Sequence, residues 1–268
     1  MKLISICPSN TELLAYLGLI DELIAVDDFS DWPESVSSLP KLGPDLSIDM
    51  DKVEQFAPDL VLASLSVPGM EKNVAELKRR GIPHIVLNPN SLDEIADDLL
   101  KVAKITATEV KARYIITKYT HFINEYKSIA NTIQKKPTLY WEWWPKPVFT
   151  PGQLNWLTYI SQLSGAVNLF KDIELASIQT DWEDVRKRNP DHICLAWVGV
   201  KQEKMKPELI RKRPDWHELD AIKYERIHIL EEPLYCRPSP RLLLGLKKLA
   251  ALIHPGTYPA DDGIDPLL

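Results

Sequence analysis

Apolar residues in the first half of the chain fall in short runs that alternate with stretches of helical spacing. The runs are almost continuously apolar, as in strands buried on both faces of a parallel sheet, and they lie at 3–7, 23–27, 60–63 and 85–87. Apolar residues recur every three or four positions in the segments between them, which predicts helices at 10–17, 50–56, 69–80 and 92–105. The alternating order predicts an α/β lobe.

A longer helical pattern follows. Residues 108–134 contain no proline or glycine, and a single helix of this length would extend about 40 Å at 1.5 Å per residue. We interpret it as a bridge between two lobes. The alternative is an ordinary surface helix of the first lobe.

The second half repeats the alternation and also part of the sequence. Strands are expected at 138–143, 193–198 and 226–230, and helices at 155–165 and 241–253. Asp49-x-x-x-Val53 before Pro58-Asp59 recurs as Asp181-x-x-x-Val185 before Pro190-Asp191. The repeat predicts a duplicated lobe, hence two Rossmann-like α/β lobes with parallel sheets joined by one long helix, at 1–107, 108–134 and 135–268. In such sheets ligands gather at the carboxyl ends of the strands, which predicts a site between two facing lobes.

Composition and charge limit which kinds of binding partner, metal site and cellular compartment are expected. The 268 residues carry a net charge of −6 with acids and bases interspersed, so the chain lacks a basic stripe for nucleic acid. Cys7, Cys194 and Cys236 are far apart, which disfavours a disulfide scaffold or a cysteine zinc site. No apolar stretch nears the roughly 20 residues of a membrane span, and no export signal is recognised. As written, the chain is expected in the cytoplasm; a truncated start or a mature form would place it in the periplasm or at the cell surface.

Aromatic loops at strand ends supply the candidate site. The segment 141–152 holds three tryptophans, including Trp143 and Trp144, and three prolines, so the chain must turn there and present indoles. A packed core corner is the alternative. Phe29 and Trp32 follow another strand beside three aspartates, which we assign to turn chemistry rather than a cation site because EF-hand spacing is missing.

Two further strand ends add candidates. The loop 234–241 brings a phenol and two guanidiniums together, and Arg241 would lie at a helix start, where the dipole gives a cation no support. A ligand, a partner acid or bracing of the loop would each explain it. Trp197 ends a strand of the second lobe. Signals for catalysis are weak, since the chain has no HExxH, GxSxG, Walker or GxGxxG motif; no catalytic or metal residues are expected.

The chain resembles the class III periplasmic-type solute-binding proteins of ABC importers, and among them the cobalamin-binding proteins. The resemblance rests on the order of six motifs along almost the whole chain: ISICPSNTEL at 4–13, FSDWP at 29–33, APDLV at 57–61, PGME at 68–71, PVFTPG at 147–152 and RPSPR at 237–241. It implies a rigid helix between lobes and a corrin ring held by Pro8, Phe29, Trp32, Trp143, Phe149, Tyr235 and Arg241. From the loops themselves we add Trp144, Trp197 and Arg237 as ligand contacts.

The resemblance also implies a permease partner, docked through one acidic residue on each lobe. Glu71 matches the first position, and Glu203 is a candidate for the second, where the sequence diverges. The predicted function is capture of cobalamin or a related corrinoid by a monomer, without catalysis. The alternatives are a ferric siderophore or haem on the same scaffold, and an intracellular enzyme or chaperone that handles corrinoids.

Overall fold

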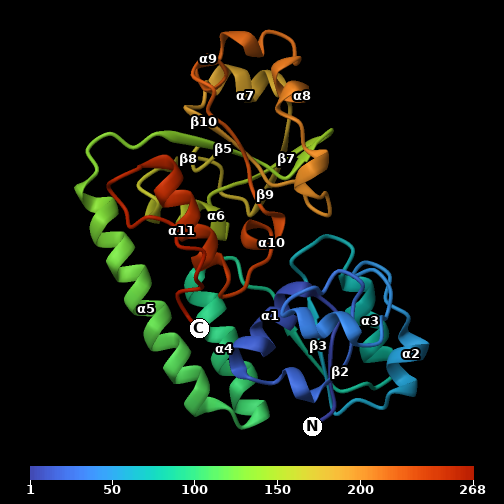
Figure 1. The fold of residues 1–268 in the computed structure, drawn as a ribbon. Coiled ribbons are helices and arrows are strands. Elements are labelled where there is room, and N and C mark those ends of the chain that lie inside the picture. The colour runs from blue at the N-terminus through green and yellow to red at the C-terminus, as the bar shows by residue number, and fades with distance from the viewer. The chain divides into compact units, whose positions relative to one another are not determined.

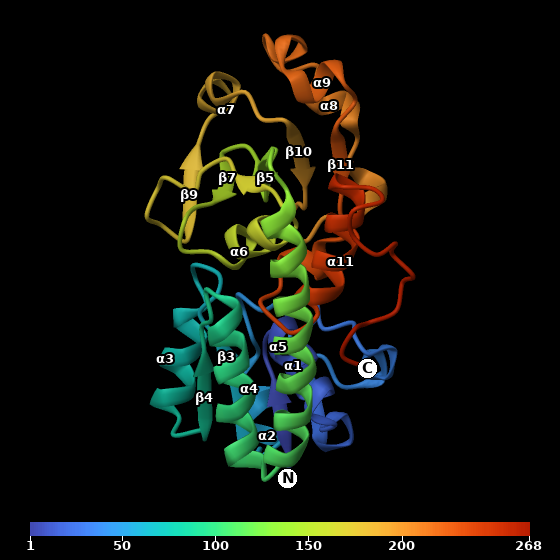
Figure 2. The same cartoon turned by 90° about the vertical axis from the view of Figure 1, so that its left-hand side faces the viewer.

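The computed structural model describes residues 1–268 and divides them into two compact units, each with its own parallel sheet. The first unit contains Met1–Tyr119, Pro238–Pro240 and Leu267–Leu268, and the second contains Thr120–Arg237 and Arg241–Pro266. The boundary falls inside α5 (Glu109–Thr132), a continuous helix of 24 residues at the position of the predicted bridge (Figure 2). The predicted two-lobed α/β fold is confirmed.

The first unit has a four-stranded parallel sheet of order β2-β1-β3-β4. Helices α1 and α4 lie on one side of this sheet, and α2 and α3 lie on the other (Figure 1). The strands are β1 (Leu3–Ser5), β2 (Leu23–Val26), β3 (Leu60–Ser64) and β4 (His84–Leu87). The helices are α1 (Pro8–Leu17), α2 (Met50–Gln55), α3 (Glu71–Arg79) and α4 (Leu92–Thr106), with 3₁₀ turns η1 (Ile20–Glu22) and η2 (Glu34–Ser38). All eight predicted elements form, within three residues at each end.

The second unit has a parallel sheet of order β11-β10-β5-β8 and a separate antiparallel sheet of order β6-β7-β9. Its strands are β5 (Thr138–Glu142), β6 (Trp144–Pro145), β7 (Val148–Pro151), β8 (Val167–Asn168), β9 (Ser177–Thr180), β10 (His192–Leu195) and β11 (Ile227–Ile229). Its helices are α6 (Trp156–Leu163), α7 (Trp182–Arg188), α8 (Pro207–Arg211), α9 (Asp220–Lys223), α10 (Glu232–Tyr235) and α11 (Leu242–Ile253), with η3 (Gln202–Lys204) and η4 (Trp216–Glu218). Figure 1 shows α6 and α11 on one side of the parallel sheet and α7 and α9 on the other.

The antiparallel sheet of the second unit was not predicted from the sequence, but the turn within residues 141–152 was. The chain leaves β5 and reverses at Lys146–Pro147, so that β6 and β7 form a short hairpin after Trp143. Gly152, just after β7, passes so close to the neighbouring backbone that an added Cβ would lie 2.3 Å from the Leu175 carbonyl oxygen. No residue with a side chain fits there without moving the loop.

The repeated sequence marks equivalent positions in the two units. Asp49 and Asp181 cap α2 and α7 by accepting hydrogen bonds from the N–H groups of Lys52 and Asp184. After each helix a residue with positive φ, Ala57 (45°) or Asn189 (44°), leads into the Pro-Asp pair.

The aspartate of each Pro-Asp pair then binds the backbone N–H at the start of the neighbouring strand. Asp59 accepts from Lys2 at 2.7 Å, and Asp191 accepts from Thr138 at 2.8 Å. Both parallel sheets also place their strands, taken in chain order, in the spatial order 2-1-3-4. The repeat is therefore structural as well as sequential.

Candidate functional site

At the edge of the first unit, Asp27 directly follows β2 and shapes the loop that carries Phe29 and Trp32. Its carboxylate accepts hydrogen bonds from the N–H groups of Phe29 (2.8 Å) and Ser30 (3.0 Å) and from the Ser30 hydroxyl (2.5 Å). Burial of this carboxyl raises its pKa to about 6. The neighbouring Asp28 accepts from the Gly43 N–H. These two acids hold the turn, in agreement with the assignment to turn chemistry.

The aromatic residues of this loop differ in exposure. Phe29 is 48% exposed, whereas the half-buried Trp32 ring packs against Tyr16 with centroids 5.3 Å apart. Pro8 is buried at the first turn of α1, where its missing N–H costs no helical hydrogen bond. Its ring therefore starts the helix that follows β1.

At the edge of the second unit, Trp143 follows directly after β5. Its backbone N–H donates to the Phe149 carbonyl (2.9 Å) and its carbonyl accepts from the Val198 N–H (3.1 Å), which fixes the Trp143 backbone between β7 and the segment after β10. The ring packs against Trp156 at 5.8 Å. The indole Nε1 is buried and has no hydrogen-bond partner, a state that costs about 1–3 kcal/mol.

Two more predicted aromatic residues share the hairpin. Trp144 on β6 faces Phe149 on β7 as a cross-strand pair. Trp144 is 42% exposed and its indole N–H donates to the Lys146 carbonyl. Trp143, Trp144 and Phe149 thus belong to one local structure.

Trp197 and Tyr235 lie in the core of the second unit. The Trp197 indole is 8% exposed and donates to Glu142 at 3.0 Å. Tyr235 is fully buried, packs against Trp141 and donates its hydroxyl proton to the Gly245 carbonyl at 2.9 Å. A ligand could reach neither ring without breaking these contacts, so we leave both out of the proposed contact set.

The charged residues predicted from the sequence, two arginines and two glutamates, lie at four different places in the fold. Arg237 is 8% exposed and pairs with Glu232 at 3.4 Å, while Arg241 stands immediately before α11. Glu71 begins α3, and hydrogen bonds from its own N–H and that of Gly69 lower the pKa of its exposed carboxyl. Glu203 is exposed in η3.

The cysteines are poor metal ligands at neutral pH because burial keeps them protonated. Burial raises the pKa of Cys7 to about 11 and raises those of Cys194 and Cys236 as well. The Cys236 thiol donates to the Ala196 carbonyl. No group of three or more His, Cys, Asp or Glu side chains is arranged to hold a metal ion.

The sequence did not indicate the polar centre of the second unit. Glu142, the last residue of β5, is fully buried and binds Arg213 through two hydrogen bonds of 2.6 and 2.7 Å. It also accepts from the Tyr140 hydroxyl at 2.6 Å and from Trp197. Arg213 in turn stacks on Trp182 (4.8 Å) and Trp216 (4.5 Å). This Glu142–Arg213 centre fixes the end of the strand that leads into Trp143.

Comparison with known proteins decides the family. The model of the periplasmic binding protein family matches residues 3–234. This chain belongs to that family. Its members bind solutes without catalysis, which confirms the prediction of a non-enzymatic binding protein. None of its helices has both the length and the apolar composition needed to cross a bilayer.

Individual relatives cover almost the whole chain. An uncharacterized ABC transporter substrate-binding lipoprotein of Bacillus subtilis, YvrC, is 29% identical over 262 residues, 96% of this chain and 81% of that protein. A vitamin B12-binding protein of Yersinia pestis is 27% identical over 252 residues, 92% of this chain and 84% of that protein. A periplasmic heme binding protein from Pseudomonas aeruginosa has the same fold, with a TM-score of 0.83, 19% identity, and 95% of this chain and 93% of that one covered.

Proposed function

We propose that this family member captures cobalamin or a related corrinoid and delivers it to the permease of an ABC importer. The proposed ligand contacts are the aromatic rings of Phe29, Trp32, Trp143, Trp144 and Phe149, together with the saturated ring of Pro8. Rigid rings suit a flat macrocycle because they offer a large contact area and lose little conformational entropy. The B12-binding and ABC-transporter names of the relatives support this choice.

The unpaired indole N–H of Trp143 carries the proposal. A buried donor without a partner is unfavourable, and the cost is recovered when a bound molecule supplies an acceptor. Corrinoids carry carbonyl acceptors in the amide side chains around the ring. Trp143 would therefore contribute both a stacking face and, after a small adjustment, a hydrogen bond.

The chemistry of nearby donors favours a corrinoid over haem. Haem-binding proteins usually coordinate the iron through an axial His, Cys, Met or Tyr. In this chain the Cys7 and Cys236 thiols stay protonated, and the Tyr235 hydroxyl is bonded to the Gly245 carbonyl. A corrinoid needs no such residue, because its cobalt can keep small axial ligands of its own.

The permease contacts remain those suggested by sequence. Exposed carboxylates at Glu71 and Glu203 would pair with basic residues of the permease, one from each unit. Replacing both with Gln should weaken docking in vesicles that contain a permease, while leaving corrinoid binding in solution unchanged.

The ligand is tested by titration with cyanocobalamin, dicyanocobinamide, haemin and ferrichrome, followed by calorimetry and by the melting temperature. A ligand at tenfold excess over its Kd adds about 1.4 kcal/mol to the free energy of unfolding, enough to shift the melt. We expect only the two corrinoids to do so. If only haemin or ferrichrome raised the melting temperature, the proposal that the ligand is a corrinoid would be refuted.

The Trp143 contact is tested by Trp143→Ala, which should weaken corrinoid binding at least about tenfold, or ~1.4 kcal/mol. Tyr224→Ala is the matched control, because Tyr224 is an exposed aromatic residue of the same unit, before rather than after β11. Equal affinities of the two variants would remove Trp143 from the site.

A further inference from the structure

The second unit carries an open pocket that shares no lining residue with the proposed corrinoid contacts. Its volume is about 450 Å³, within the usual range for small-molecule sites of roughly 300–1,000 Å³. The lining comes from the β6–β7 hairpin, the end of β9, the start of α7 and one residue beyond α8: Pro145, Lys146, Pro147, Val148, Thr180, Asp181, Trp182, Glu183 and Pro214.

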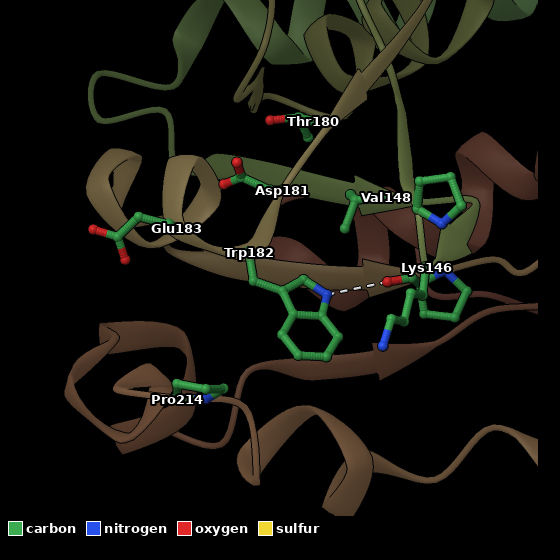
Figure 3. Close-up of a pocket in the computed structure, with 9 residues that line it drawn as sticks. Lys146, Val148, Thr180, Asp181, Trp182, Glu183 and Pro214 are labelled. Carbon is green, nitrogen blue, oxygen red and sulfur yellow. Dashed lines mark hydrogen bonds between the residues drawn. The ribbon is translucent and has the colours of Figure 1, made fainter.

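Trp182 gives this pocket a rigid aromatic wall. Its indole N–H donates to the Pro145 carbonyl at 3.1 Å, and the Arg213 guanidinium stacks on its ring at 4.8 Å. Arg213 is itself held by the buried carboxylate of Glu142. Figure 3 shows the indole between the hairpin segment at Lys146 and the loop at Pro214. The wall is therefore set before any ligand arrives.

The remaining walls are also apolar and stiff. Pro145, Pro147 and Pro214 have almost no side-chain entropy to lose when they are covered, and Val148 is buried beside the turn of the hairpin. A flat ring entering the pocket would meet rings on several sides. Aromatic rings also gain energy from stacking on an indole beyond the area they bury.

The charged groups at the rim determine the sign of the ligand. Asp181 accepts the capping hydrogen bond from the Asp184 N–H, and Glu183 forms two hydrogen bonds of 2.8 Å with Arg186. Glu183 points away from the indole in Figure 3. The exposed Lys146 ammonium has no acid partner. Lys146 is thus the rim cation with which an anion can pair, whereas Glu183 is already paired with Arg186 and Asp181 caps α7.

We propose that this pocket is a second small-molecule site that takes a planar aromatic carboxylate. The ring packs against Trp182 and the prolines, and the carboxylate pairs with Lys146. The site is separate from the proposed corrinoid contacts, so it stands or fails independently of them.

The test uses protein labelled with 5-fluorotryptophan, in which Trp182→Phe identifies the Trp182 fluorine signal. Indole-3-acetate is titrated beside its neutral analogue indole-3-acetamide and the cation tryptamine. We expect a saturable shift of the Trp182 signal with indole-3-acetate at submillimolar Kd. The acetamide should bind about two- to fivefold more weakly, the range that exposed ion pairs support, and tryptamine more weakly still.

Charge variants complete the test. Lys146→Gln should reduce indole-3-acetate affinity to that of the acetamide, whereas Lys171→Gln, at an exposed lysine outside the pocket, should leave it unchanged. Saturation with cyanocobalamin should alter neither result. The proposal is overturned if the Trp182 signal does not saturate by about 5 mM, if all three probes bind equally, or if a proline-rich peptide shifts Trp182 and indole-3-acetate does not.

Discussion

Replacing the buried Arg213 with Met should cost far more stability than replacing Arg186, a half-buried surface arginine that also binds one carboxylate through two hydrogen bonds. Arg213→Met removes two of the four hydrogen bonds to the Glu142 carboxylate, which is fully buried and would keep only Tyr140 and Trp197 as donors. Leaving one member of a buried ion pair alone costs about 3–5 kcal/mol. Arg186 binds Glu183 through two hydrogen bonds of 2.8 Å at the surface, where the Glu183 side chain is 51% exposed, so Arg186→Met should cost less than about 1 kcal/mol.

A second substitution separates the buried charge from the packing. Glu142→Gln in the Arg213→Met background removes the stranded charge but keeps an oxygen that can accept from Tyr140 or Trp197. The double variant should therefore recover about 2–3 kcal/mol relative to Arg213→Met alone, because a neutral amide costs less to bury than a carboxylate.

Urea unfolding followed by tryptophan fluorescence measures these differences in the appropriate unit. Seven of the eight tryptophans, all except Trp32, belong to the second unit, so the signal reports its unfolding. Far-ultraviolet circular dichroism checks that the transitions coincide. The reasoning is refuted if Arg213→Met costs no more than Arg186→Met, or if Glu142→Gln worsens the double variant.

Three further predictions concern pH and backbone strain. Burial raises the Asp27 pKa to about 6, so between about pH 4 and 6 the folded state holds a proton that the unfolded state has lost. The free energy of unfolding should therefore fall by about 2–3 kcal/mol as the pH rises through this range. In urea titrations Asp27→Asn should remove this fall. Burial lowers the His192 pKa to about 4 and also lowers the pKa of His228, its hydrogen-bonded neighbour. The protein should therefore lose stability as the pH drops from about 6.5. His228→Gln should make the melting temperature depend less on pH. Ala57→Gly should stabilise by about 0.5–1 kcal/mol because φ there is 45°, whereas Gly81→Ala, at φ 67°, should destabilise; equal signs in thermal melts would contradict this.

Strong periodicity made the fold predictable where elements were long or fully apolar. The run Leu60–Ser64 and the helix Leu92–Thr106 each carry an unambiguous pattern, and Ser91 caps the latter with its side chain as its position suggests. Short elements carry too little pattern. Strand β8 is only Val167–Asn168, and β7 ends in a proline, a residue that sequence reasoning counts against a strand.

The candidate site shows a different limit of sequence reasoning. Aromatic residues beside prolines mark a loop, and this located Trp143 and Trp144 at the end of a strand. Whether an aromatic ring faces a ligand or the core depends on contacts with distant residues. Trp197 is held by Glu142, which lies 55 positions away, and Glu142 is held by Arg213, 71 positions away. No local spacing encodes these contacts.

The repeated Pro-Asp contacts, in which Asp59 and Asp191 bind the start of a neighbouring strand, have a consequence for how ligand specificity could change in this fold. Asp59 and Asp191 secure equivalent sheets at the amino ends of β1 and β5, whereas the loops at the opposite ends have little in common: Asp27–Pro33 in one unit, Trp143–Gly152 in the other. In this arrangement the contacts that secure each sheet are separate in the chain from the loops that we propose as ligand contacts. If the proposed contacts hold, each unit can exchange these loops while it keeps the contacts that secure its sheet, and grafting such loops between relatives should change which ligand is bound.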